Sequence, residues 1–501
     1  MRKEYDELLS LFKEASIVEE IDMLLYWDRD VTMPKKGWKQ RADQVAFISQ
    51  LAHEKKINPK IKELLVSIVE HPDYEKLSEQ EKRNVYLIKR KYEKMVKVPP
   101  DFVGEFSKQG VIANKAWEEA REKSDFSIFQ PELEKMVEFN KKFAHYLNPE
   151  IDPYDVLIDY SEPSMTQEKF EKLVNPLKEA VVTLIKECLA SATQPDMSIL
   201  KRKVPIDIQK KLNLDLLKVL DYDLERSRLD ETVHPFTTGS YDDVRITTRY
   251  YKENFLSAFM STMHEAGHGD YELHVGKLGS YQPVGQWCSD GVHEACSRFY
   301  ENILGRSEAF WKYYFFKFKE LTGEIFADVS LEDLILAVNK VEPSAIRTEA
   351  DELTYDLHII MRFEFERDLL NEKIKVKDLP ELWNKKMKEL LGYEVKNDAE
   401  GVLQDVHWSE GLMGYFPTYT LGNIFGAQIL MQLQKEIPNW ESEIEHGNLK
   451  KILDWFRENV HEKGNMKDSF ELVQDITGKE VTSDYLIEYL KVKYSKLYNL
   501  S

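Results

Sequence analysis

The sequence predicts a mainly α-helical protein, because helix-forming residues are dense along the chain and helix breakers are few. Only 18 prolines and 21 glycines occur among 501 residues, and Leu, Ile, Tyr, Lys and Glu recur with helical patterning. The first sixteen residues, MRKEYDELLSLFKEAS, already read as an amphipathic polar helix. No Pro/Ser-rich linker, low-complexity tract or internal repeat divides the sequence, so we expect a single domain over residues 1–501.

Composition and charge exclude several classes of function. The formal net charge is −20, and no basic track with interleaved aromatic residues is present, which argues against a nucleic-acid partner. Neither a signal peptide nor a long apolar run is found, so we expect a cytoplasmic protein with no membrane partner. The three cysteines, Cys188, Cys288 and Cys296, suit a reducing compartment.

The most informative motif is HEAGH at residues 264–268. Two imidazoles four residues apart, His264 and His268, face the same side of a helix, and Glu265 lies one helical step away. This arrangement is typical of zinc peptidases, in which two His ligands and a carboxylate base surround an open coordination position. The alternative is a pair of solvated histidines, but the apolar residues before the motif predict a helix that is at least partly buried.

A third protein ligand is needed, and several residues could supply it. His274 lies where a related protease motif places its third histidine, but this chain lacks the glycine which that turn requires. Glu294 lies in a second helical stretch, GVHEACSR (291–298), beside His293, and only one of these two neighbours can face the metal. Cys288 and Cys296 flank this stretch, although a catalytic zinc is normally held by His and carboxylate. We therefore choose Glu294.

One run looks extended instead of helical. Residues 241–250 alternate Val244, Ile246 and Thr248 with Asp243 and other polar residues after a Gly-Ser pair. We interpret this run as a strand beside the site that binds a peptide by edge pairing. A plain surface hairpin is the alternative.

Taken together, these motifs resemble the Taq-type (thermostable) HExxH zinc metallocarboxypeptidase family. The resemblance runs from about residue 8 to the C-terminus, and departures such as Ala295, in place of the usual Ser, do not touch a proposed ligand. Its motifs are HEAGH (264–268) and GVHEACSR (291–298), with LYWD (25–28), MP (33–34), HPF (234–236), DVRIT (243–247), IRTEAD (346–351), GVLQDVHW (401–408) and GYFPTY (414–419).

The resemblance implies a fold, an activity and an assembly state. The fold is a large helical metallopeptidase fold with a long active-site groove and a small β-hairpin or sheet beside the metal site, the helices of about residues 1–150 covering the groove. The activity is removal of C-terminal residues from peptides that have a free C-terminus. One Zn²⁺ per chain is the expected cofactor, with Co²⁺ as the alternative, and Glu265 is the general base. A homodimer is also implied.

Six further residues are candidates for contacts with the substrate. Arg347 and Arg245 could bind the terminal carboxylate, because a guanidinium pairs with both of its oxygens, and His234 could line the pocket. His407 and Tyr419 are the candidates for stabilising the oxyanion, with Tyr415 as the alternative to Tyr419.

Two other functions remain open from the sequence. Within the enzyme class, the alternative is a zinc oligopeptidase or dipeptidyl carboxypeptidase. Outside it, the alternative is a non-catalytic helical scaffold whose metal is structural or absent, although such a site would need no base at Glu265.

Overall fold

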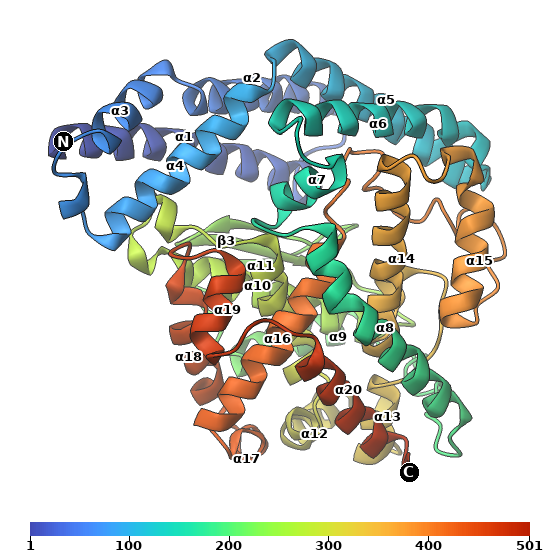
Figure 1. Ribbon diagram of the computed structural model, residues 1–501. Coiled ribbons are helices and arrows are strands. Elements are labelled where there is room, and N and C mark those ends of the chain that lie inside the picture. The colour runs from blue at the N-terminus through green and yellow to red at the C-terminus, as the bar shows by residue number, and fades with distance from the viewer. Residues whose placement is uncertain (501) are drawn as a thin grey trace.

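A computed structural model of the protein describes residues 1–500 and confirms a mainly helical chain with one small sheet. Figure 1 shows six N-terminal helices lying across the top of the molecule, above a larger helical body. These six helices are α1 (Arg2–Val31), α2 (Trp38–Lys56), α3 (Pro59–Val69), α4 (Glu79–Lys97), α5 (Pro100–Lys123) and α6 (Phe126–Leu147).

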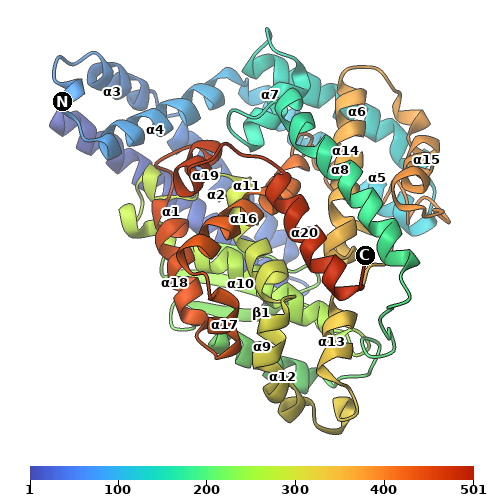
Figure 2. The same ribbon diagram turned by 60° about the horizontal axis from the view of Figure 1, so that its bottom comes forward.

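The remaining helices form the body, and the turned view in Figure 2 shows α16 and α20 packed side by side within it. They are α7 (Pro153–Ser161), α8 (Gln167–Ala190), α9 (Ile206–Val219), α10 (Phe255–Val275), α11 (Asp290–Arg298), α12 (Glu308–Thr322), α13 (Leu331–Val338), α14 (Glu352–Leu370), α15 (Leu379–Leu391), α16 (Pro417–Glu436), α17 (Trp440–Glu445), α18 (Leu449–Asn459), α19 (Ser469–Thr477) and α20 (Asp484–Leu497). No helix within residues 1–500 is both long and apolar enough to cross a bilayer.

Two hydrophobic clusters hold these helices together. The large cluster extends from Val98 to Tyr498 and includes most of α10, α11, α14 and α16. The small cluster lies among α1, α3 and α4 and contains Leu8, Ile68 and Ile88. Helices α1, α3 and α4 therefore have a core of their own, whereas α5 and α6 share the core of the body.

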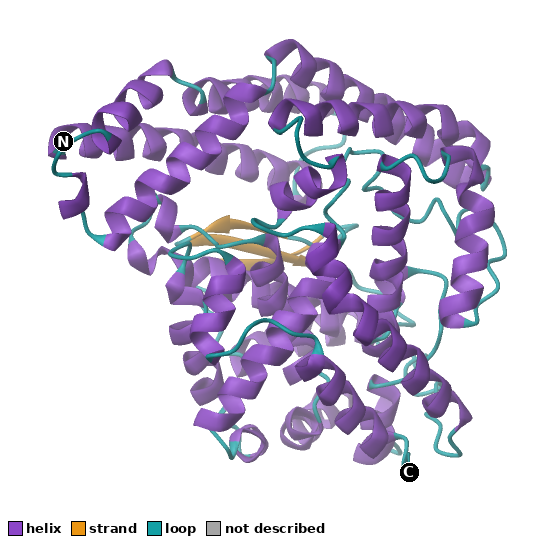
Figure 3. Cartoon of the chain, in the orientation of Figure 1, coloured by secondary structure: helices purple, strands orange, loops and turns teal. Residues whose placement is uncertain are grey.

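The sheet has three strands, β1 (Ser227–Glu231), β2 (Thr237–Ser240) and β3 (Asp243–Thr248), in the order β1-β3-β2. β3 is parallel to β1 and antiparallel to β2. Figure 3 shows the sheet between the N-terminal helices and the body, and both β2 and β3 pack against α10. The sheet therefore lies beside the HEAGH helix.

The strand expected at residues 241–250 exists as β3, with Val244 and Ile246 buried as the alternation predicts. Our prediction that this strand pairs with a peptide through a free edge is wrong, because β3 is the central strand and both of its edges are hydrogen-bonded. The error arose because a period of two identifies a strand and its buried face, but not its position in a sheet.

Candidate metal centre

Helix α10 presents the HEAGH motif, and a glycine lets the next helix approach it closely. The helix begins after Asn254, whose side chain accepts a hydrogen bond from the Ser257 amide. A Cβ atom added at Gly267 would lie 2.6 Å from the carbonyl oxygen of Cys296. Any larger residue at this position would therefore force α11 away from α10. The close approach brings Glu294 of α11 opposite the two motif histidines.

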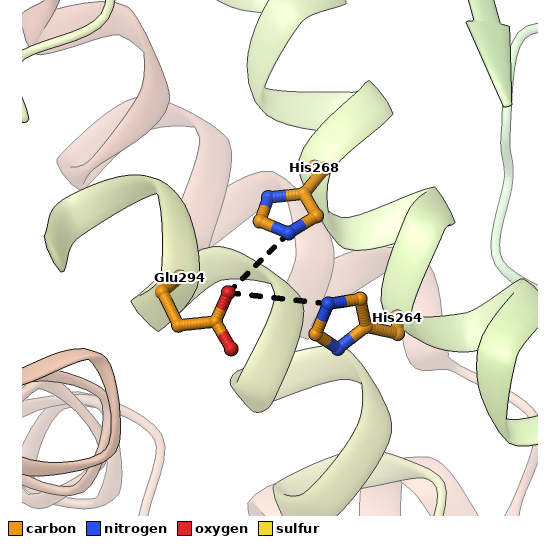
Figure 4. Close-up of side chains that lie close together, drawn as sticks. All are labelled: His264, His268 and Glu294. Carbon is orange, nitrogen blue, oxygen red and sulfur yellow. Dashed lines mark ion pairs between the residues drawn. The ribbon is translucent and has the colours of Figure 1, made fainter. Parts of the chain in front are cut away.

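Three of the predicted ligands converge at this helix pair. The His264 Nε2 and His268 Nε2 atoms lie 3.9 and 3.4 Å from the Glu294 Oε2 atom (Figure 4). One donor atom from each of the three residues lies within 4.8 Å of the others. The group has the composition of a catalytic zinc set, two imidazoles and one carboxylate.

Hydrogen bonds on the far side of each imidazole determine which nitrogen faces Glu294 as an acceptor. His264 Nδ1 lies 3.0 Å from a Glu301 carboxylate oxygen and must donate its proton there. His268 Nδ1 lies 2.7 Å from His293 Nδ1, and His293 Nε2 lies 3.1 Å from Glu272 Oε1. Because His293 donates to Glu272 from Nε2, its Nδ1 atom accepts, and His268 donates from Nδ1. Both motif histidines then present bare Nε2 lone pairs to Glu294.

The Glu294 carboxylate is held as an anion. Arg298 Nε donates to Glu294 Oε1 over 2.6 Å. Burial alone would raise the pKa of Glu294, but neighbouring groups, of which the positive charge of Arg298 is the largest, hold that pKa well below its usual range. A Cβ atom at Gly422 of α16 would lie 2.6 Å from Glu294 Cγ, so that glycine also makes room for the side chain. Two imidazole nitrogens and a carboxylate oxygen that face one another are suited to hold a cation between them, so the residues fit a bound metal ion.

Glu265 lies beside this group and is buried, with only 6% of its surface exposed. Its Oε2 atom accepts a 2.6 Å hydrogen bond from the Thr237 hydroxyl on β2. Burial raises the pKa of Glu265, and His264 and Thr237 offset only part of that effect. A carboxylate with a raised pKa beside a metal site is suited to accept a proton.

The other candidate ligands lie elsewhere. His274 belongs to a separate group with Asp270 and His461. His293 supports His268 from behind. Cys288 and Cys296 are buried, and they belong to neither of the two groups of candidate ligands within residues 1–500.

A second cluster combines most of the predicted substrate residues. Arg347 is buried, and it donates from Nε to Asp405 Oδ1 over 2.9 Å and from Nη1 to the Tyr355 hydroxyl over 3.0 Å. Its guanidinium carbon lies 5.1 Å from the centre of the Tyr419 ring. The His407 Nε2 atom is 3.2 Å from the Tyr419 hydroxyl.

The two clusters are in contact through one aromatic ring. The Arg298 guanidinium, which holds Glu294, stacks over the Tyr355 ring at 4.2 Å, and Tyr355 accepts from Arg347. Tyr415 also belongs to the second cluster, with its ring centre 5.5 Å from that of Tyr419.

Arg245 and His234 are not part of these clusters. Arg245 pairs with Asp243 on its own strand and stacks over Trp27 of α1 at 4.2 Å. His234 is exposed in the loop between β1 and β2. The structure therefore supports Arg347 over Arg245 as the cation near the metal centre.

Several residues of the site were missed from the sequence. Arg298 and Glu301 follow Glu294 by four and seven residues, and that spacing on one helical face could have identified them. The segment after α11 is a π-helix, Phe299–Leu304, which carries Glu301 and is a common feature of functional sites. Thr237 and Asp405 reach the site through tertiary packing; Asp405 lies within the GVLQDVHW motif, but no local pattern signals Thr237.

The comparisons with known proteins agree with this geometry. Residues 7–494 match the family model described as carboxypeptidase Taq (M32) metallopeptidase. Carboxypeptidase 1 of Bacillus subtilis is 41% identical over 99% of this chain and 98% of its own length. Thermostable carboxypeptidase 1 of Thermus thermophilus is 38% identical over 99% of both chains.

Solved structures give the same result. The crystal structure of the M32 carboxypeptidase from Deinococcus radiodurans superimposes with a TM-score of 0.95 at 36% identity, covering 99% of this chain and 100% of the other. The HEAGH and GVHEACSR stretches, which the match includes, form the candidate metal centre described above. This chain belongs to the carboxypeptidase Taq (M32) family, and it is a metallocarboxypeptidase.

Proposed function

We propose that the enzyme removes single C-terminal residues from peptides with one Zn²⁺ held by His264, His268 and Glu294. The observation that carries this proposal is the convergence of the His264 and His268 Nε2 atoms on the Glu294 carboxylate, with a second partner holding each imidazole from behind. Co²⁺ accepts the same donor set and is the alternative ion. When bound, such an ion supplies Lewis-acid chemistry at the scissile carbonyl and makes a water more acidic.

Glu265 acts as the general base in this proposal. Thr237 occupies one of its oxygens, so the Glu265 Oε1 atom is left to take a proton from the attacking water. The same carboxyl group then passes the proton to the amine that leaves. Burial of Glu265 raises its pKa, which favours proton uptake in the first step.

His407 and Tyr419 stabilise the oxyanion. Burial raises the pKa of Tyr419 above its usual range, so the phenol keeps its proton and can donate it in a hydrogen bond. Burial, aided by Arg347, lowers the pKa of His407 to about 3, so this imidazole is neutral and can also donate. Tyr415 is the alternative donor.

Arg347 recognises the terminal carboxylate of the substrate. Its cluster contains two guanidinium groups, Arg347 and Arg362, and both pair with the single carboxylate of Asp405. The two guanidinium groups share one carboxylate, so Arg347 has no carboxylate of its own, and the C-terminus of a peptide can supply one. Within residues 1–500, Arg347 Nη2 makes no hydrogen bond, so it remains for the substrate. A homodimer and a cytoplasmic location remain predictions.

The test is product analysis on a series of N-terminally blocked peptides. Mass spectrometry should detect stepwise loss of single C-terminal residues, abolished by a chelator and restored by Zn²⁺ or Co²⁺. Release of dipeptides or internal fragments would replace this proposal with a dipeptidyl carboxypeptidase or an oligopeptidase. Absence of cleavage by the metal-loaded protein would favour a non-catalytic scaffold.

A further inference from the structure

A second group of metal-binding side chains lies at the C-terminal end of α10. Asp270 and His274 are one helical turn apart on this helix, and His461 belongs to the short helix η8 (His461–Lys463), which follows α18. One donor atom from each of these three residues lies within 4.8 Å of the others. His274 follows His268 by six residues, so the second group lies about 9 Å further along the helix axis.

His461 is the observation that points to a ligand. Its side chain has no exposed surface, and neither of its ring nitrogens has a hydrogen-bond partner within residues 1–500. Burial lowers the pKa of His461 to about 3, so the ring is neutral and one nitrogen carries a free lone pair. Its Nδ1 atom lies 3.5 Å from Asp270 Oδ2. A fully buried imidazole without a partner is costly, and a bound cation removes that cost.

The carboxylate of the group is already oriented. Arg457 donates to both oxygens of Asp270, over 2.8 and 2.9 Å, and the Tyr300 hydroxyl donates to Oδ2 over 2.7 Å. These three bonds leave one acceptor position of Asp270 Oδ1 unused. His274 Nδ1 donates to the Asp270 backbone carbonyl over 2.8 Å, so Nε2 is the nitrogen of His274 that is left to bind a cation. The carboxylate can therefore bind a cation without losing its present partners.

The surrounding charges accept an added cation. The Arg457 guanidinium also pairs with Asp221 and Asp454, and Lys450 pairs with the same two carboxylates. With Asp270, three carboxylates oppose two cations, which leaves a surplus of one negative charge. A purely structural Asp270–Arg457 pair would account for neither this surplus nor the unpartnered imidazole.

The group also has a route to solvent. His274 lines a polar pocket with a volume of about 480 Å³, together with Asp221, Asp223, Asp454 and Glu458. An ion can reach the site through this pocket, and water can complete its coordination. All three side chains of this group are proposed ligands, so none of them is left to act as a general base in the way that Glu265 does.

We propose that Asp270, His274 and His461 form a second divalent transition-metal site, suited to Zn²⁺, which ties the C-terminal end of α10 to η8. Two imidazoles and one carboxylate match the preference of this ion. The site binds and stabilises, and it takes no part in peptide cleavage.

Metal counting on the full-length protein tests this proposal. The protein is stripped with a chelator, dialysed against buffered excess Zn²⁺ and analysed by mass spectrometry of the metal. The wild type should hold two ions per chain. His274→Gln and His461→Phe should each hold one ion and retain kcat, whereas His264→Gln should hold one ion and lose activity. A wild-type content of one ion would overturn the proposal, since an internal water would then account for His461.

His446→Gln is the matched control. His446 is exposed directly after α17, and its Nδ1 atom bonds the carbonyl four residues earlier, as His274 Nδ1 does. This variant should retain two ions. If His461→Phe fails to fold, His274→Gln still decides, because the His274 side chain is 23% exposed and lies outside the core.

Heat denaturation provides a readout that is independent of activity. A second equivalent of Zn²⁺ should raise the Tm of the wild type and should leave the Tm of His461→Phe unchanged. Retention of two ions by both the His274 and the His461 variants would place the second ion elsewhere and contradict the assignment.

Discussion

The metal side and the substrate side of the active centre are built in opposite ways. The metal side comes from one short stretch of chain, residues 264–301, in which α10 and α11 follow one another. The substrate side combines Arg347, Tyr355, Asp405 and Tyr419, which come from a short helix, α14, a long loop and α16. One continuous stretch contains the residues of the first side, whereas the second side is brought together from four segments only after the chain has folded.

The two sides also differ in the sign of their charge. On the metal side, carboxylates outnumber guanidinium groups. The carboxylates are those of Glu265, Glu272, Glu294 and Glu301, and the guanidinium groups are those of Arg298 and Arg306. On the substrate side Asp405 alone opposes Arg347 and Arg362. The negative side suits a cation and the positive side suits the free carboxylate of a peptide, which is the orientation that the proposed function requires.

The largest expected effect is on the metal side, at the general base. Glu265→Gln should lower kcat by roughly 10²–10⁴-fold and keep the metal, because no carboxylate remains to accept the proton of the water. Turnover and metal content should be measured on the same sample. Glu272→Gln, on the same helix, is the control and should lose far less. A Glu265 variant with more than about a tenth of wild-type kcat would exclude it as the base.

The next effect separates a metal ligand from its support. Glu294→Gln should weaken the binding of the activity-restoring metal more than Glu301→Gln, for which about 10- to 100-fold is expected because Glu301 only orients His264. Titration of stripped enzyme with buffered Zn²⁺, followed by activity, gives both affinities. If the Glu301 variant bound the metal more weakly than the Glu294 variant, Glu301 would be the metal ligand and Glu294 the residue that supports it.

On the substrate side, amidation of the peptide C-terminus should lower kcat/KM by about 10- to 100-fold, because a charge-assisted contact with Arg347 is lost. Arg347→Ala should impose a similar loss on free-acid peptides and almost none on amides. Arg245→Ala is the control and should discriminate as the wild type does, since Arg245 pairs with Asp243 and Trp27. If Arg347→Ala still cleaved free-acid peptides in preference to amidated ones as strongly as the wild type does, a residue other than Arg347 would bind the terminal carboxylate.

The smallest effect concerns the contact between the sheet and the base. Thr237→Val removes a neutral hydroxyl that donates to Glu265, so kcat should fall by about five- to tenfold. That hydroxyl also lowers the pKa of Glu265, so its loss should move the acidic limb of the kcat/KM profile to higher pH. Thr237→Ser should preserve both properties. If the acidic limb of the kcat/KM profile did not shift in Thr237→Val, a group other than Glu265 would determine that limb.

Features set by local geometry could be read from the sequence alone. The helical content, the strand at residues 243–248 and the facing of His264 and His268 follow from the periods of helices and strands. The motifs also predicted the family correctly, over nearly the whole chain.

Tertiary structure decided what spacing along the chain leaves open. Glu294, and not His274, lies against the two imidazoles, because Gly267 and Gly422 admit α11 and α16 at close range. Arg347 is linked to the metal centre through Tyr355 and Arg298, whereas Arg245 pairs with Asp243 and stacks over Trp27. The physical reason is the same in each case. Helical and strand periods determine which way a side chain points, whereas the partner that it meets depends on packing between elements far apart in sequence.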